Sequence, residues 1–420
     1  ATVNETTFRV WGAQTGLRAG SVAYDPSTRK ATFTPAEPFA YGELVSAVIT
    51  RGAATAAGQH LRGFVWEFSV KTLPSGAHFE RTAEWEGFGY AVAPADFDGD
   101  GDIDLATVQP GGVNVWKNDG AGSFRKHGDY AAPNDNPYRR STKAADLDND
   151  GDVDLAVGAG GTVVVIKNTG DGTFGEPAFY PVQAGNGPSS VVVADFDADG
   201  DLDVASVSTR WVSVLGNDGT GAFVVQFSPF AYEVPEFNAV LAAADFDEDG
   251  DVDLASGASG AGMSRAAILR NNGAGLFRQE EPSYQIGNSH LDFMCADVDG
   301  DRDVDLIQVG AGGRYDGAVN GNDGLGIFGG PGSYGVWGVM GVTADFDGDG
   351  RQNLAVFDND QSYGRPPTLW VMWPHRSHTL DRTPHAAAAA DVDGDGDADM
   401  IGITDGAVRT VFVLKNGDGP

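Results

Sequence analysis

The residues of this chain best suited to chemistry are aspartates, which stand at alternate positions of a short acidic loop. The first such loop runs from Asp96 to Asp104, with an aspartate at every second position and Gly101 in its middle. Carboxylates this close together repel one another unless a cation lies among them. Ca2+ suits such a loop, because it takes about six to eight oxygen ligands in flexible geometry. The spacing therefore predicts a calcium site.

The loop occurs seven times, at a spacing of 46 to 52 residues. We number the loops one to seven and the positions within each loop one to nine, starting at its first aspartate. The candidate metal-binding residues are Asp96, Asp98, Asp100, Asp102 and Asp104 in loop one; Asp146, Asp148, Asp150, Asp152 and Asp154 in loop two; Asp195, Asp197, Asp199, Asp201 and Asp203 in loop three; Asp245, Asp247, Asp249, Asp251 and Asp253 in loop four; Asp297, Asp299, Asp301, Asp303 and Asp305 in loop five; Asp345, Asp347, Asp349, Arg351 and Asn353 in loop six; and Asp391, Asp393, Asp395, Asp397 and Asp399 in loop seven. Up to seven Ca2+ ions are expected, one in each repeat.

The segments around each loop indicate short β-strands. A small apolar run such as 191–194 precedes the loop, and a β-rich run such as 163–166 follows it. A turn of the type Asn118-Asp119-Gly120 comes next, and an aromatic residue such as Phe124 stands just after it. Repeats of this length indicate units that cannot bury their apolar faces alone. About four short strands in each repeat form the blade of a β-propeller, so the sequence predicts an all-β, seven-bladed propeller.

The ends of the repeat region suggest how the ring closes. The last repeat stops at residues 416–420, where an outer strand should begin. The segment Gly76-Ala77-His78-Phe79, before the first loop, has the Gly-x-Phe pattern that follows the other turns. We therefore expect residues 77–85 to form the outermost strand of the last blade.

These motifs resemble the FG-GAP or VCBS repeat family, whose calcium-binding propellers include the head of integrin α chains. The resemblance covers residues 76–420, and Phe88-Gly89 and Ala93-Pro94 echo the words that named the repeat. It implies that each acidic loop is the hairpin between the first two strands of a blade. It also implies side-chain ligands at positions one, three, five and nine, and a backbone carbonyl ligand at position seven.

Two loops depart from the pattern. Loop five has Arg302 at position six, where the other loops have glycine, and a left-handed turn costs more free energy for arginine. Loop six has Arg351 at position seven and Asn353 at position nine. We expect a weaker site in loop six and a distorted one in loop five.

The loops have two alternative interpretations. EF-hand or dockerin repeats need an acid at position twelve and flanking helices, but this position holds Thr107, Val157, Ser206 and Ser256 in loops one to four. Acidic turns without metal are the second alternative. More than half of the 60 acidic residues fall within the seven loops, which favours the metal.

Residues 1–72 lack the acidic loop and alternate strand signals with turns. The run from Phe33-Thr34-Pro35 to residues 66–70 resembles a bacterial Ig-like domain of surface-layer and adhesin proteins. We expect an Ig-like β-sandwich over 1–72, a linker over 71–76, and the propeller over 73–420. The domain starts late, so it either lacks a strand that another chain could donate or is a truncated or divergent small domain.

Composition narrows the partners and the compartment. A net charge of −33 argues against binding nucleic acid or anionic membranes. No apolar stretch is long enough to span a bilayer, and no signal peptide is visible, so Ala1 is expected to be a processed or artificially chosen start. A single cysteine, Cys295, excludes an internal disulfide and is expected to be a small buried hydrophobe. Calcium binding favours an extracellular or cell-surface location.

No catalytic constellation stands out, so we expect no enzyme. His375 and His378 are the closest histidine pair, in a predicted exposed loop. The favoured function is a calcium-stabilised surface module for adhesion or assembly, with an unidentified protein or glycan ligand. One alternative is a subunit of an extracellular filament or sheath that assembles by strand donation into the Ig-like domain. The other is a lectin or polysaccharide lyase, whose aromatic platforms would come from Trp116, Trp211, Trp337, Trp370 and Trp373.

Overall fold

The structure is a computed structural model of the 420-residue chain. It describes residues 3–87, 89–109, 111–132, 141–159, 161–182, 188–208, 211–226, 232–233, 240–259, 264–280, 283–287, 292–310, 317–330, 332–333, 338–358, 366–372, 375–404 and 409–417. Strands and turns make up these residues, without an α-helix among them, so the all-β prediction is confirmed. The described residues contain no helix that could cross a membrane.

The N-terminal region pairs a four-stranded sheet with a hairpin. The sheet has the order β2-β1-β5-β6 and consists of β1 (Phe8–Gly12), β2 (Gly16–Leu17), β5 (Leu44–Ile49) and β6 (Phe64–Ser69); the hairpin consists of β3 (Gly20–Asp25) and β4 (Lys30–Pro35). One face of the sheet turns Phe8, Val10 and Ala47 toward Val22 and Phe33 of the hairpin. The period-two alternation of strands places Trp11, Val48 and Val65 on the opposite face, which packs against the rest of the molecule.

Seven antiparallel sheets of the up-and-down type occur in the remaining described residues. In chain order they are β8 (Ala91–Ala95), β9 (Asp104–Gln109), β10 (Gly112–Lys117) and β11 (Arg125–Ala131); β12 (Thr142–Ala145), β13 (Asp154–Ala159), β14 (Thr162–Ile166) and β15 (Ala178–Pro181); β16 (Pro188–Ala194), β17 (Asp203–Ser208), β18 (Trp211–Asn217) and β19 (Phe223–Gln226), with β20 (Tyr232–Glu233) also on β18; β21 (Val240–Ala244), β22 (Asp253–Ser259), β23 (Ser264–Asn271) and β24 (Phe277–Gln279), with β25 (Tyr284–Gly287) also on β23; β26 (Asp292–Ala296), β27 (Asp305–Val309), β28 (Ala318–Asn320) and β29 (Gly332–Ser333); β30 (Met340–Ala344), β31 (Asn353–Asp358), β32 (Thr368–Met372) and β33 (Arg376–Thr379); and β34 (Pro384–Ala390), β35 (Asp399–Thr404), β36 (Thr410–Lys415) and β7 (Glu80–Glu86).

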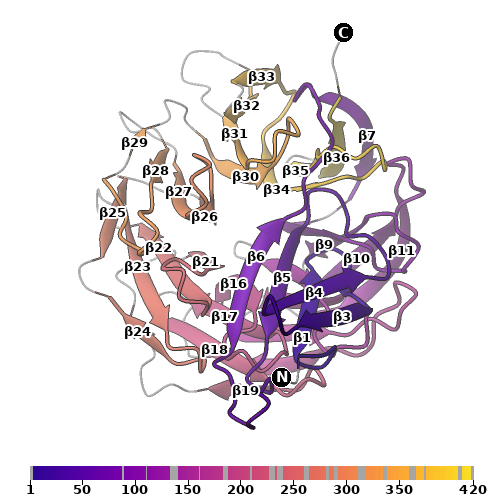
Figure 1. The fold of residues 1–420 in the computed structure, drawn as a ribbon. Helices are drawn as coiled ribbons and strands as arrows, with labels where there is room; N and C mark the ends of the chain where they lie inside the picture. The colour runs from indigo at the N-terminus through magenta and orange to yellow at the C-terminus, as the bar shows by residue number, and fades with distance from the viewer. Residues whose placement is uncertain are drawn as a thin grey trace.

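The first strands of these sheets form a ring. Each of β8, β12, β16, β21, β26, β30 and β34 contacts the next one, and β34 contacts β8. They line a central channel with a cavity of about 550 Å³, which Lys143, Asp292 and His385 also face. Ala13 and Gln14 of the N-terminal region line the same cavity, and Figure 1 shows the N-terminal sheet lying over the ring. The N-terminal region therefore covers one mouth of the channel.

The ring is closed by a strand from far away in the sequence. Strand β7 pairs antiparallel with β36, with Glu86 opposite Thr410 and Glu80 opposite Lys415. The expected edge strand was 77–85, and the strand lies at Glu80–Glu86. The chain just before it is also fixed, because Phe79 packs edge-on against Phe346, with ring centroids 5.6 Å apart.

Neighbouring sheets are held together by one repeated aromatic contact. Position two of most acidic loops is a fully buried phenylalanine, and it meets the phenylalanine that follows the turn of the next sheet. The edge-on pairs are Phe97 with Phe174, Phe196 with Phe277 and Phe246 with Phe328, at 5.4, 5.5 and 5.6 Å between ring centroids. Phe346 and Phe79 make the same contact. The aromatic residue after each turn is thus part of the packing between sheets.

Candidate metal centre

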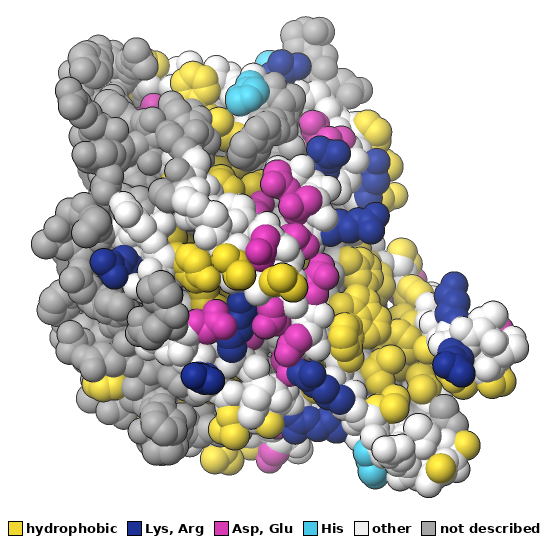
Figure 2. Space-filling model, turned by 60° about the vertical axis from the view of Figure 1, so that its left-hand side comes forward, with side chains coloured by type: hydrophobic (Ala, Val, Ile, Leu, Met, Phe, Trp, Pro, Cys, Tyr) yellow, Lys and Arg dark blue, Asp and Glu magenta, His cyan; other side chains and the backbone are white. Residues whose placement is uncertain are grey.

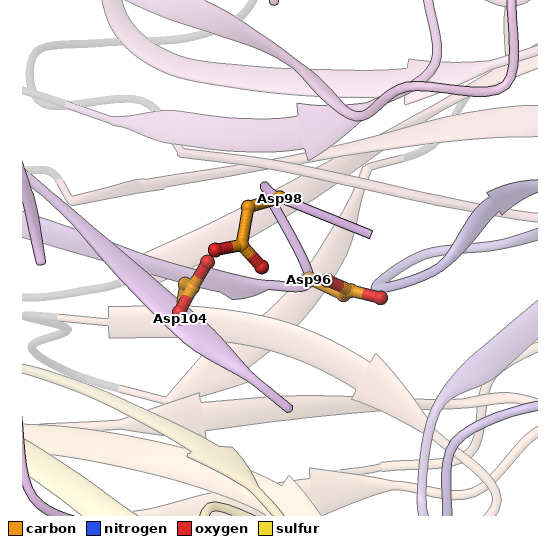
Figure 3. A group of neighbouring side chains, drawn as sticks. All are labelled: Asp96, Asp98 and Asp104. Carbon is orange, nitrogen blue, oxygen red and sulfur yellow. The ribbon is translucent and has the colours of Figure 1, made fainter. Parts of the chain in front are cut away.

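Each acidic loop joins the first strand of a sheet to the second, so all seven loops lie at the same end of the ring. Figure 3 shows the carboxylates of loop one, where Asp98 and Asp104 point toward each other and Asp96 lies beside them. One oxygen from each of Asp96, Asp98 and Asp104 lies within 4.8 Å of the other two. Equivalent trios occur in loops two, four and five, and loop three brings together Asp195, Asp197 and Asp199.

The first aspartate of each loop holds the turn closed. In loop one the Asp96 carboxylate accepts the N–H of Gly101 at 3.1 Å and that of Gly99 at 2.8 Å. Position six has a positive φ in all seven loops, between 85° and 101°. Glycine adopts this conformation freely, which explains its recurrence at position six.

Loop five keeps the same turn with arginine. Arg302 has a φ of 85°, and its N–H donates to Asp297 at 3.0 Å, as the glycine N–H does elsewhere. The backbone thus follows the other loops at this point. Placing a non-glycine residue in the left-handed region costs free energy on the order of 1 kcal/mol.

The residue at position nine of the loops, aspartate in all but loop six, also accepts backbone hydrogen bonds, a role that the sequence did not predict. One oxygen of Asp104 accepts the N–H of Phe97 at 3.3 Å, and the other accepts the N–H of Asn118 at 2.8 Å. The side chain of Asn118 donates in turn to the Val392 carbonyl of loop seven at 2.7 Å. The same Asn and Asp pairing recurs at Asn168, Asn217, Asn271, Asn322 and Asn416. Position nine therefore ties the loop to the turn, in addition to facing the trio.

Burial disfavours the charged form of these carboxylates. It is the main reason that the pKa of Asp104 is raised to about 7, and the pKa values of Asp154 and Asp399 to about 8. The neighbouring aspartates raise them further, since like charges repel. Each loop thus concentrates negative charge in a place that water does not fully solvate.

Several buried oxygens in the loops lack a hydrogen-bond partner in the described structure. They are Oδ1 of Asp98, Asp148, Asp247 and Asp393 at position three, Oδ1 of Asp146 and Asp345 at position one, and Oδ1 of Asp251 and Asp397 at position seven. A buried oxygen without a partner costs free energy, about 1–3 kcal/mol each, and more for a charged group. Clustered, hard carboxylate oxygens with free lone pairs fit a hard divalent cation. The donor set therefore suits Ca2+.

The N-terminal region rests directly on the acidic loops. Arg9 donates to the Gly200 carbonyl at 2.6 Å, to Asp201 at 2.9 Å and to Asn149 at 2.7 Å, and so joins loops two and three. Arg62 binds Asp249 at 3.1 Å and also Asp251. Further contacts to the loops use backbone and hydroxyl groups. The Asp96 N–H donates to the Gln14 carbonyl, and the other donors and acceptors are Leu17 to Asp146, Arg51 to Ala198, Val65 to Gly250, Thr72 to Asp345 and Leu73 to Gly396. Figure 2 shows acidic side chains in a band on one face, with basic side chains along it.

The remaining sequence candidates have other surroundings. Trp116 is buried and donates to Thr107 at 3.0 Å, so it is part of the packing and offers no open platform. Trp211 and Trp370 are partly buried, whereas Trp337, Trp373 and Phe88 lie outside the described residues. His378 contacts the Ala77 carbonyl through Nε2 at 3.2 Å, and His375 is exposed. Cys295 was expected to be buried; it is partly buried and lines a cavity of about 360 Å³ beside the channel.

Comparisons with known proteins agree with the repeat and the fold. The family model described as FG-GAP-like repeat matches residues 96–157, 146–206 and 245–308. The crystal structure of BBS1N in complex with ARL6DN is 12% identical and covers 84% of this chain and 100% of its own, with a TM-score of 0.55. Two further structures match with TM-scores below 0.5. A lectin from Agrocybe aegerita that recognises non-reducing terminal N-acetylglucosamine is 17% identical over 98% of this chain and 90% of its own, at 0.48, and the Dos1 propeller is 12% identical over 98% and 95%, at 0.47. No curated protein sequence matches significantly.

The sheets and the structural match support a β-propeller fold, and the chain contains FG-GAP-like repeats over 96–206 and 245–308. Its loops contain aspartate clusters that could hold a metal ion.

Proposed function

We propose that this protein is a non-enzymatic, calcium-stabilised module of an extracellular or cell-surface protein, which acts in adhesion or assembly. The observation that carries the proposal is the set of buried carboxylate oxygens without partners, repeated in the acidic loops at one end of the ring. Bound Ca2+ would neutralise these carboxylates and so stabilise the folded state.

The ligands would come from the chain in a fixed pattern. In loop one the free oxygen is Oδ1 of Asp98, and the carboxylates of Asp96 and Asp104 lie beside it. Position five lies at the outer side of the loop, where Asp100 accepts the N–H of Asp102 at 3.0 Å with one oxygen and keeps the other for an ion. In this proposal the seven sheets are the blades of one propeller over 73–420, and residues 1–72 form an Ig-like β-sandwich.

Calcium titration tests the proposal directly. The protein is stripped with EGTA, desalted and titrated with CaCl2 in a calorimeter, with metal content measured by mass spectrometry. We expect up to seven bound Ca2+, with dissociation constants on the order of 10⁻⁴–10⁻³ M, the range of extracellular calcium modules. If the protein binds no calcium at a free Ca2+ concentration of about 5 mM, the proposal is refuted.

The partner in this proposal is a protein or a glycan, bound by a surface that is still to be mapped. The net charge of −33 disfavours nucleic acid and anionic lipid as partners. Surface binding assays against immobilised glycans and matrix proteins, in calcium and in EGTA, would identify the class. A glycan ligand together with product release would instead support the lectin or lyase alternative.

Assembly by strand donation is the second candidate, and the N-terminal region favours it. The hairpin β3–β4 is a sheet of two strands among the described residues, so it covers only part of the four-stranded sheet. Phe64 and Phe68 of β6 lie in register with Ile49 and Val45 on the core face, yet they are 43% and 44% exposed. A donated strand beside the hairpin would cover them. Electron microscopy and light scattering test this: ordered polymers that disappear with Phe68→Glu would support it, and a monomer at high concentration would contradict it.

A further inference from the structure

A basic side chain stands at the same place in four of the seven sheets. It is the residue just before the turn asparagine: Lys117, Lys167, Arg270 and Lys415, in the first, second, fourth and seventh sheets. Each of them binds the aspartate at position three of its own acidic loop. The distances are 2.8 Å from Lys117 to Asp98, 3.1 Å from Lys167 to Asp148, 3.6 Å from Arg270 to Asp247 and 2.9 Å from Lys415 to Asp393.

The same side chains reach the turn of the next sheet. Lys415 donates to the Ala121 carbonyl at 2.6 Å, Arg270 to the Gly326 carbonyl at 3.0 Å, and Lys167 to the Thr220 carbonyl. Lys117 lies against Gly172, where an added side chain would collide with it. One cation thus joins a loop to the neighbouring sheet.

The bonding of the position-three carboxylate is divided between its two oxygens. In these four loops Oδ2 faces the cation, while Oδ1 is buried without a hydrogen-bond partner in the described structure. At the equivalent place the third and fifth sheets have Gly216 and Gly321, and the sixth has Trp373, which lies outside the described residues. Asp197, Asp299 and Asp347, the position-three residues of those sheets, have no such orphaned buried oxygen among the described atoms.

We propose that Lys117, Lys167, Arg270 and Lys415 are positioning residues that keep loops one, two, four and seven formed and joined to the next sheet, with the free oxygen of position three directed at the ion. A charge-assisted hydrogen bond to a backbone carbonyl fixes the side chain, and the fixed side chain fixes the carboxylate. The loops therefore fall into two classes. The four clamped loops keep their shape when the metal is removed, whereas loops five and six depend on the metal for it. Loop three has Arg9 of the N-terminal region at position seven instead.

The role of the free oxygen rests on the proposed calcium binding, but the join between sheets does not. Hydrogen exchange of the full chain separates the two, because it is measured both in calcium and in EGTA. In EGTA we expect segments 297–305 and 345–353 to exchange much faster than in calcium, and segments 146–154 and 391–399 to change little. If the chain binds no calcium, the two conditions agree everywhere, and the comparison of variants in EGTA still reports on the clamp.

The decisive variant is Lys167→Met in EGTA. We expect about tenfold faster exchange in 146–154 and in the turn 217–222 of the next sheet, the effect of losing a charge-assisted hydrogen bond. Segment 391–399, which has its own clamp, is the internal reference. Lys167→Arg restores the protection, because arginine fills this role in the fourth sheet. Lys126→Met is the matched control: Lys126 pairs with Asp129 at 2.6 Å, away from the loops. Unchanged exchange in Lys167→Met, or clamped loops that lose as much protection as loops five and six, would overturn the proposal.

Discussion

Replacing Asp98 by alanine should destabilise the protein in calcium and leave its stability almost unchanged in EGTA. Asp98 Oδ2 pairs with Lys117 at 2.8 Å, Oδ1 is buried without a partner, and the side chain is 15% exposed. In calcium the variant loses the site of loop one. At a free calcium concentration about 100 times the dissociation constant, one site contributes about 2.7 kcal/mol to the free energy of unfolding.

In EGTA two smaller effects oppose each other. The variant loses the ion pair with Lys117, worth about 0.2–1 kcal/mol for a pair near the surface. It also removes a negative charge whose repulsion contributes to the raised pKa of Asp104. These terms have opposite signs, so the net change in EGTA is expected to be below about 1 kcal/mol. The difference between the two conditions, about 2 kcal/mol or more, is therefore the contribution of the ion.

Urea unfolding followed by tryptophan fluorescence measures both values, with free calcium set from the titration described above. Asp129→Ala is the control, since Asp129 pairs with Lys126 on β11 and its side chain is 60% exposed. It should behave alike in both conditions. Equal destabilisation of Asp98→Ala in calcium and in EGTA would refute the reasoning, because the carboxylate would then act only through protein contacts.

Further expectations concern pH, the weakest loop, the N-terminal contact and the thiol. Burial raises the pKa of Asp104 to about 7 and that of Asp154 to about 8. Metal-free folded protein thus holds protons that the unfolded chain, with pKa values near 3.8, releases. Calorimetry in EGTA should show a melting temperature that falls from pH 5 to pH 8, while in calcium it rises because protons compete with the ion; a parallel trend in both would contradict this. Asn353→Asp restores the acid at position nine of loop six and should tighten its binding in a calcium titration, whereas an unchanged isotherm would count against a weak site there. Arg9→Ala removes three hydrogen bonds to loops two and three and should destabilise the N-terminal region by about 2 kcal/mol, seen as an earlier calorimetric transition; no shift would mean that Arg9 does not anchor it. Burial raises the pKa of Cys295 to about 12, so iodoacetamide at pH 8 should label the folded protein far more slowly than the urea-unfolded protein, and equal rates would contradict the buried setting.

The acidic loops and the strand order were accessible from sequence because both are local. The alternation of Asp96 to Asp104, the glycine at position six and the turn at Asn118 each fix a short stretch of backbone. Counting strands in one repeat then leads to the propeller, and the FG-GAP-like repeats and a propeller neighbour support this fold. The repeated Phe after each turn was visible as well, although its partner, the phenylalanine at position two of the preceding loop, was not identified.

Contacts between residues that are farther apart in the sequence could not be predicted in this way. Asp104 was assigned only to the metal, but its two oxygens also bind the N–H groups of Phe97 and Asn118. That double role depends on the turn lying beside the loop, which follows from the packed sheet and from no single motif. The recurrence of asparagine at the start of the turn in six of the seven repeats was the available signal, since a tight turn alone would also accept aspartate or glycine.

No sequence signal predicts where the N-terminal region lies on the acidic loops. Its position nevertheless decides which contacts metal binding can influence. This region contacts carbonyls at positions one, four and six, as with those of Asp345, Ala198 and Gly250. It also contacts side chains at positions one, four, five and seven, which are those of Asp146, Asn149, Asp249 and both Asp201 and Asp251. The unpartnered oxygens that suit an ion are mostly at positions one and three, and among the described residues the carbonyl at position seven accepts no backbone hydrogen bond from this region. Where both sets share a residue they use different oxygens, since Leu17 binds Oδ2 of Asp146 and Arg62 binds Oδ2 of Asp251 while Oδ1 of each stays without a partner in the described structure. An ion and the N-terminal region therefore fit on one loop at the same time. Arg9 and Asp201 lie at that junction. Removing the ion would leave loop three with the same arginine but more uncompensated charge, which strengthens the pull on Arg9 while it loosens the loop. If the loops bind calcium as proposed, the ion sets the rigidity of the surface on which the N-terminal region rests, whether or not it sets the affinity between the two.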